Sequence, residues 1–442
     1  MRASVYWAFI FLSLPFIWRR PLWGLILYTF FNIIRPEMFF WGGNTGAKTF
    51  VVLFACTWIA TILNSGRFTF KSFLEPQPLL ILWLYGALIL SIFLSHYEIS
   101  RSYYYANEIV KTYLYAVLLV VLVNNFQEIR TLENFILFSF VLLGIWGIQQ
   151  HFLGNARLEG LGGHASSDTN GVAALFVLTS PLAFQKLFDG DNNKTKFIGF
   201  TASTIMILLV IFTQSRGGLL GFATVVAVMI LRINNRTKAL IAALLITVIV
   251  LPFISQSYVR RVSSMENEET LGWSAKSRII LWKAGLMVFR DHPLFGTGFL
   301  SYPLAKMEYE NNFDYLEPDF KAWVFRNYNP KVTHNTYIEI LSDAGLFAAV
   351  PYFLLVFGTF LKNRTLRKII PVTEKNKELF SFLGAIEAGI AGFCVCIFFI
   401  NAITAVFLPI QIIVSAIIRK EIQDTPQEAL STTKRMEHAR TR

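Results

Sequence analysis

Three side chains suited to phosphate chemistry stand at the edges of long apolar runs. Arg216 lies in TQSRGGLLG, Arg278 in AKSRIILWKAG and His334 in THNTYIEILSDAGL. A guanidinium stays charged and donates paired hydrogen bonds to phosphate oxygens, so two arginines can hold a pyrophosphate. Histidine is the side chain most easily poised as a base near neutral pH, where it can take a proton from an attacking hydroxyl. The three residues together indicate group transfer from a diphosphate-linked substrate.

Each of these residues also has a structural interpretation. Arg216 could be a boundary arginine whose charge reaches water, although Gly217 and Gly218 would let a ligand approach the backbone closely. Arg278 could be exposed on an interfacial helix, with Trp282 on the same face at a spacing of i, i+4. A lone histidine at a helix start is more often structural than catalytic. The residue types alone leave both interpretations open.

A second set of polar residues could line such a site. His164 lies in GLGGHASSDTN, Asp168 and Asn170 precede an apolar run, and Asn335 directly follows His334. Asp168 and Asn170 could instead cap the helix that begins there. The sequence has no HExxH, Walker A, GxSxG or cysteine–histidine metal spacing, so we expect neither a metal nor a cofactor.

Membrane-spanning helices are expected on either side of these residues. The chain has 442 residues, 54% of them hydrophobic and 15% aromatic. Apolar runs of about 16 to 22 residues recur along nearly the whole chain, long enough to cross a hydrocarbon core roughly 30 Å thick. Backbone groups in lipid must be paired internally, and these runs do not alternate as barrel strands do. The sequence therefore predicts an all-α polytopic membrane protein.

We predict 12 or 13 spans, depending on whether both members of the short first pair cross the membrane. They cover residues 4–17, 21–36, 47–63, 78–95, 107–124, 131–153, 170–187, 196–213, 217–232, 238–255, 338–361, 379–399 and 402–418. The last two are joined by almost nothing.

The distribution of basic residues orients the spans. By the positive-inside rule, the connections rich in Lys and Arg belong to the cytoplasmic side; they hold Arg19 and Arg20, Arg67 and Lys71, Lys186 to Lys196, Arg232 to Lys238, and Lys362 to Lys368. The outer connections are then 37–46, 96–106, 154–169 and 256–337, and the last carries 10 Lys/Arg against 9 Asp/Glu. The formal charge of +12 is thus mostly topological and does not indicate a nucleic-acid partner.

Four regions follow from this organisation. They are a transmembrane bundle (1–255), an outer loop that forms a cap (256–337), C-terminal transmembrane helices (338–418) and a tail (419–442) that we expect to be disordered. The loop contains KSRIILWKAGLMVF, typical of an amphipathic helix, and the turn-forming DHPLFGTGF, so we expect it to be folded. Outside a cell there is no ATP supply, so a phosphate substrate there would be lipid-linked.

The motifs resemble a known family when taken in order. TQSRGGLLG, SRIILWKAGLMVFRDHPLFGTGF and THNTYIEILSDAGLFAAVPY, around a large outer loop, resemble the O-antigen ligase and polymerase superfamily over residues 170–361. RRPLWGLILYTFFNIIRP more loosely resembles the O-glycosylation ligases of exosortase-type gene clusters. The resemblance implies an inner-membrane glycosyltransferase of the GT-C class that works at the periplasmic face without a metal. Its donor would be a glycan on undecaprenyl diphosphate.

The resemblance also implies roles for the three residues. Arg216 and Arg278 would hold the diphosphate, and His334 would activate or orient a hydroxyl that attacks the anomeric carbon with inversion. In the ligase branch the acceptor is a sugar of lipid A–core, but polymerases and protein O-oligosaccharyltransferases share the pattern. The chain shows no large soluble C-terminal domain, which mildly favours the ligase.

A lipid-linked glycan flippase is the alternative from another class. It would require charges deep inside several spans. The spans appear nearly uncharged in the sequence, with polar groups at one face, so the sequence favours an enzyme.

Overall fold

The computed structural model describes residues 3–36, 46–64, 76–95, 97, 100–155, 158, 161, 168–232, 273–326 and 331–424. All regular structure within these residues is helical. The helices are α1 (Ala3–Arg19), α2 (Leu22–Ile34), α3 (Gly46–Leu63), α4 (Pro76–Phe93), α5 (Ser100–Leu122), α6 (Phe126–Phe152), α7 (Thr169–Asp189), α8 (Asn193–Phe212), α9 (Arg216–Arg232), α12 (Trp273–Asp291), α13 (Tyr302–Ala305), η6 (Lys306–Phe313), α14 (Pro318–Phe325), α15 (Thr336–Ile369), α16 (Lys377–Cys396) and α17 (Phe407–Asp424).

Every predicted span that falls within the described residues coincides with one of these helices. Seven helices are long and apolar enough to cross a membrane, namely α4, α5, α6, α7, α8, α15 and α16. Helices α1, α2 and α3 contain shorter apolar segments, and the predicted span 238–255 lies outside the described residues. The all-α membrane architecture is confirmed, while the predicted number of 12 or 13 spans stays a prediction.

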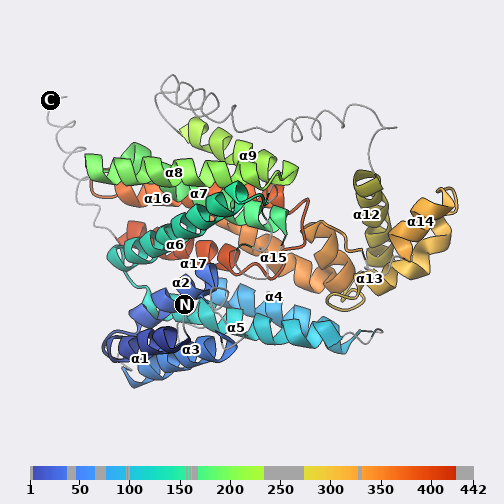
Figure 1. Ribbon diagram of the computed structural model, residues 1–442, viewed down its shortest axis with the longest axis horizontal. Coiled ribbons are helices and arrows are strands. Elements are labelled where there is room, and N and C mark those ends of the chain that lie inside the picture. Colours follow the sequence, from blue (N-terminus) through green and yellow to red (C-terminus); the bar gives the residue numbers. More distant parts are fainter. Residues whose placement is uncertain are drawn as a thin grey trace, which may run out of the picture.

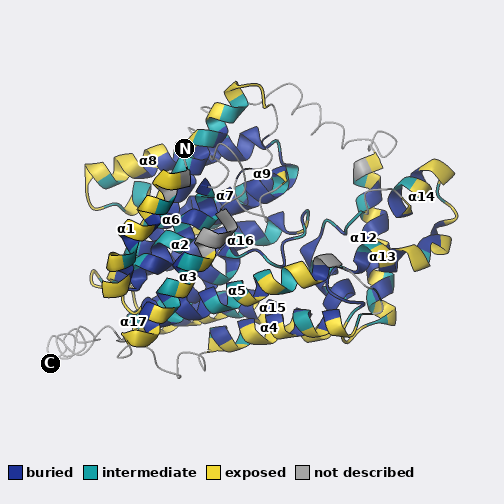
Figure 2. Cartoon of the chain, turned by 60° about the horizontal axis from the view of Figure 1, so that its bottom comes forward, coloured by how far each residue is buried: buried dark blue, intermediate teal, exposed yellow. Residues whose placement is uncertain are grey.

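The long helices form one bundle, and the helices of the predicted outer loop project from one end of it (Figure 1). Helix α7 lies at the centre, packed against α8, α9 and α16. Figure 2 shows buried residues concentrated on such central helices and exposed ones on α1 and α8. Large apolar side chains are among those exposed, including Leu12 and Phe16 of α1 and Phe197 of α8. This distribution is typical of helices whose outer faces contact lipid rather than water.

Helix α15 is broken at Gly345, a feature that its continuous apolar run did not predict. The backbone there has φ 64° and ψ −165°, which favours glycine because a Cβ would clash. The loop 293–298 pairs with the opened turn, and its four hydrogen bonds are Thr297 N to Ser342 O (3.0 Å), Gly298 N to Asp343 O (2.9 Å), Leu346 N to Pro293 O (2.8 Å) and Phe347 N to Leu294 O (3.0 Å). Since unpaired backbone groups are costly away from water, this loop makes the break tolerable.

The helices α12, α13, η6 and α14, here called the cap helices, are fixed to the first part of α15. They share a small apolar core that includes Leu281 and Tyr302, and the predicted amphipathic helix lies within α12. The Asp343 carboxylate of α15 accepts hydrogen bonds from Leu300 N (2.9 Å) and Tyr302 N (3.0 Å). The cap and the residues that begin α15 are therefore held as one unit.

The described helices are less free of charge than their sequence suggested. Glu133 of α6 and Glu387 of α16 are buried, as is Arg419 near the end of α17. Glu133 accepts from Gln411, and Glu387 accepts from two arginines. Polar groups thus gather at both ends of the bundle, and those away from the outer loop are paired between helices. Helix α17 also includes the first six residues of the predicted tail, 419–424.

Candidate functional site

Several of the residues singled out in the sequence lie near the starts of three helices. Ser215 Oγ donates to Asn170 Oδ1 at 2.7 Å, which joins the start of α9 to the start of α7. The charges of Arg278 and Asp168 both act on His334, which brings α12 and the residue preceding α7 to the start of α15. Arg216 directly follows Ser215. The residue before α7 and the start of α15, well over 100 residues apart in the sequence, thus lie at one region, here called the candidate site.

Local sequence explains why the three helices begin there. Asp168 Oδ1 accepts from Gly171 N at 2.5 Å, Ser215 Oγ from Gly218 N at 3.0 Å, and Asn335 Oδ1 from Tyr337 N at 3.0 Å. Aspartate, serine and asparagine are preferred at this position because their oxygens satisfy backbone donors of the first turn. Asp168 is therefore both a helix cap, as one interpretation held, and a neighbour of His334.

Converging helix starts favour an anion. The first turn of a helix presents unpaired N–H groups and a partial positive charge, so it attracts phosphate and carboxylate groups. Helices α7, α9 and α15 all begin at the candidate site. The charges of Arg216 and Arg278 add to this potential.

Arg216 occupies an electrostatically costly position. It is the first residue of α9, where a cation meets the positive end of the helix dipole. It is half-buried, and no carboxylate pairs with it among the residues that the structure describes. The adjacent glycines serve packing, because a Cβ on Gly217 would meet the Phe399 ring and one on Gly218 would meet Ala173.

His334 has an unusual backbone conformation and an imidazole pKa below its ordinary value. Its φ of 48° lies in the left-handed region, which costs a non-glycine residue on the order of 1–3 kcal/mol and often marks functional sites. Burial lowers the pKa of the His334 imidazole to about 4, with Arg278 and Lys331 adding to the effect and Asp168 opposing it. At neutral pH the ring is therefore uncharged and keeps a lone pair that can accept a proton.

Neighbouring side chains fix the backbone on which His334 stands. Trp282 Nε1 donates to Thr333 O at 2.9 Å, which places this predicted lining residue next to the histidine. Thr333 Oγ1 accepts from Asn401 Nδ2 at 3.0 Å. The Thr336 hydroxyl donates to Ile400 O at 2.8 Å.

Two of these contacts come from the connection between α16 and α17, residues 397–406, which the sequence suggested was almost absent. Asn401 is the residue that sequence reasoning missed. It is an amide within the apolar stretch FFINAITAVF, and that polar interruption was the available signal. Of the predicted lining residues, His164 lies outside the described part of the chain.

Comparison with known families agrees with the order of the motifs. Residues 201–353 match the model of a family described as O-Antigen ligase. The matched range contains Arg216, Arg278, Trp282 and His334 but neither Asp168 nor Asn401, which only the fold brings to the site. No curated protein matches the chain. The resemblance of the N-terminal segment to exosortase-associated ligases stays a prediction.

Proposed function

We propose that the protein is an O-antigen ligase, which transfers a glycan from undecaprenyl diphosphate to a sugar hydroxyl of lipid A–core. The proposal places it in the bacterial inner membrane with the candidate site facing the periplasm, as a metal-independent, inverting glycosyltransferase of the GT-C class. The family match supports a role in O-antigen assembly. The observation that carries the proposal is the neutral His334 within the field of Arg278, beside three converging helix starts.

The arrangement supplies each part that the transfer requires. Arg216, Arg278 and the helix starts would bind the diphosphate oxygens and stabilise the charge that develops as the lipid diphosphate leaves. The acceptor oxygen forms a bond to the anomeric carbon from the opposite side while the bond from that carbon to the diphosphate oxygen breaks. His334 would take the acceptor's proton or orient its hydroxyl.

Donor binding would change the basicity of His334 in the useful direction. In the free protein, Arg278 helps to keep the pKa of the imidazole low. A diphosphate bound between the arginines would offset this positive field, and a nearby anion raises the pKa of an imidazole. His334 would thus become a stronger base when the donor is in place. This change favours proton removal from the acceptor hydroxyl while the donor is bound.

Buried charges inside the spans would support the flippase alternative, but the contacts of these charges weaken that support. A transport path requires polar groups that line a way through the membrane. The buried Glu133 and Glu387 instead contact Gln411 and two arginines of neighbouring helices. These contacts favour fixed interhelical pairing, so the enzyme remains the better proposal.

The acceptor is tested by a competition experiment with purified protein. Lipid-linked glycan is incubated with lipid A–core, with a second lipid-linked glycan, or with a Ser/Thr peptide, and the glycosylated products are separated. We expect glycosylated lipid A–core. Product only on the second glycan would identify a polymerase, and product only on the peptide a protein O-oligosaccharyltransferase.

The absence of a metal requirement is tested in the same assay. Transfer should persist at the wild-type rate in EDTA because arginines and helix starts, rather than a cation, stabilise the leaving diphosphate. Loss of transfer that magnesium restores would replace this mechanism with a metal-dependent one.

A further inference from the structure

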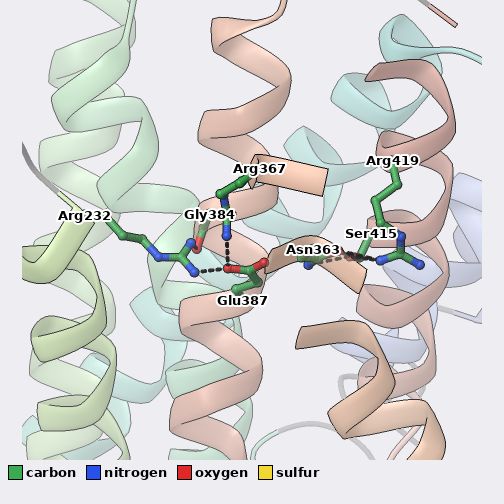
Figure 3. Close-up of polar contacts among 7 residues, drawn as sticks. All are labelled: Arg232, Asn363, Arg367, Gly384, Glu387, Ser415 and Arg419. Atoms are coloured by element: carbon green, nitrogen blue, oxygen red, sulfur yellow. Dashed lines mark hydrogen bonds and ion pairs between the residues drawn. The ribbon is translucent and has the colours of Figure 1, made fainter. Parts of the chain in front are cut away.

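A cluster of arginines occupies the end of the bundle opposite the candidate site. Arg232 and Arg367 both donate to Glu387 Oε2, the latter at 2.7 Å, and Arg232 Nη1 also donates to Gly384 O at 2.7 Å (Figure 3). Arg232 is the last residue of α9, about 24 Å from Arg216 at 1.5 Å per residue. Three helices, α9, α15 and α16, therefore meet at a single buried carboxylate.

A third arginine on the other side of α15 has only neutral partners among the described residues. Arg419 Nη1 donates to Asn363 Oδ1 at 2.6 Å and to Ser415 Oγ at 3.0 Å. Figure 3 shows Asn363 and Arg367 on the same helix, between the two groups. Three guanidinium charges in the drawn cluster thus face one carboxylate, which leaves an excess of two positive charges.

Of this excess, the charge on Arg419 is buried, at 7% exposed, whereas Arg232 and Arg367 are partly exposed at the edge of the bundle. The side chains of Arg232 and Arg367 are 31% and 30% exposed, whereas that of Glu387 is 3% exposed. Large exposed apolar residues are neighbours of the two arginines in the sequence, Leu231 at 76% exposed and Ile369 at 69%. Each guanidinium has five N–H donors; hydrogen bonds to described residues use two on Arg232 and one on Arg367, and Arg367 Nη2 is buried without a partner among those residues. Both guanidinium groups therefore keep donors that no described residue accepts.

We propose that Arg232 and Arg367 bind the phosphate of an anionic phospholipid at this end of the bundle. The N–H donors that no described residue accepts match phosphate oxygens, and the exposed apolar residues at the same two helix ends match the acyl chains of the same molecule. Basic pockets between transmembrane helices bind anionic lipid headgroups for these reasons. The proposal does not depend on the ligase function, because the candidate site lies at the other end of α9.

A lipid-retention experiment tests the site. The full-length protein is purified with phosphatidylglycerol or with phosphatidylcholine of identical acyl chains, and retained lipid is counted by native mass spectrometry. We expect preferential retention of phosphatidylglycerol, and a reduction of about tenfold or more in its affinity for the Arg232→Gln/Arg367→Gln double variant. Inorganic phosphate should not compete at equal concentration because it lacks the apolar part.

Two further variants separate binding from structural damage. Arg364→Gln removes an exposed arginine one turn from Arg367 on α15 and should retain the lipid as the wild type does. Glu387→Gln removes the competing carboxylate, so phosphatidylglycerol retention should rise, whereas a purely structural cluster would lose it. Equal retention of both lipids by the wild type, full competition by inorganic phosphate, an equal loss in Arg364→Gln, or unchanged or lower retention by Glu387→Gln would overturn the proposal.

Discussion

The two ends of helix α9 carry arginines in opposite electrostatic situations. Arg232, the last residue, lies at the negative end of the helix dipole and donates to Glu387 and to Gly384 O. Arg216, the first residue, lies at the positive end, and no described carboxylate pairs with it. A charge at a helix end contributes about 0.3–1 kcal/mol, with a sign that depends on the end.

This difference distinguishes an arginine in a stabilising position from one for which we propose a binding role. Arg232 is where folding favours a cation, whereas Arg216 opposes the dipole of its own helix and must be explained by something other than stability. A bound anion would make the charge of Arg216 favourable at this helix end instead of costly. Functional sites commonly break local rules of stability in this way.

The largest expected effect is that of Arg216→Ala on transfer. The rate of glycan transfer should fall by about 10²-fold or more because the group proposed to stabilise the leaving diphosphate is lost. The melting temperature should stay equal or rise, since an unfavourable charge is removed. Transfer and thermal unfolding are measured on the same preparation, with Arg364→Ala as the charge-matched control. A fall in melting temperature alongside the loss of transfer would make Arg216 a structural residue.

The opposite end should show the reverse pattern. Glu387→Gln leaves two arginines without their carboxylate, and we expect a loss of about 1–3 kcal/mol of stability, less than for a fully buried pair because both arginines are partly exposed. Transfer per folded molecule should stay within twofold of the wild type. Unfolding is followed by thermal denaturation in detergent. Unchanged stability would show that the two ends do not differ as described.

The pKa of the His334 imidazole gives a further test of the end of the bundle where the candidate site lies. The proposed role of His334 requires the neutral imidazole, which a lowered pKa keeps available down to about pH 4. The kcat/KM of the free enzyme should therefore begin to fall near pH 4 rather than near 6.5, as pH decreases through the folded-state pKa. Because the Asp168 charge raises that pKa, Asp168→Asn should move the acid limb to lower pH. A limb near 6.5, unmoved by the variant, would contradict this assignment.

The smallest expected effect is that of Asn401→Ala. It removes the hydrogen bond to Thr333 Oγ1, and one such bond is worth about 1 kcal/mol, or roughly fivefold in rate. The loss should appear in kcat with KM for the lipid donor unchanged, because Asn401 positions the backbone beside His334. Asn64→Ala, at the end of α3, is the control, and an equal effect of both variants would remove Asn401 from the site.

The sequence predicted the helices well because the information lies in composition. Each predicted run inside the described residues became a helix, since an apolar run in lipid has few other ways to pair its backbone. The order of motifs also singled out Arg216, Arg278 and His334 as candidate site residues, a prediction that still awaits its test. What hydropathy could not reveal was the break at Gly345, because it depends on pairing with the loop 293–298, about 50 residues away.

Long-range contacts account for the other omissions. Asn401 reaches Thr333 only because the connection 397–406 folds back to the start of α15. The Glu387 pairing depends on α9, α15 and α16 meeting at one end. Single charges in apolar runs mark such places, but their partners come from the packing of the bundle.

Under the proposed function, His334 acts in glycan transfer at the candidate site. This role is tested by a single-turnover reaction of the purified protein with undecaprenyl diphosphate-linked glycan and lipid A–core, comparing equal amounts of folded wild type and His334→Ala. We expect glycosylated lipid A–core from the wild type and a rate lower by about 10²- to 10⁴-fold from the variant. Transfer by His334→Ala at the wild-type rate would contradict the account.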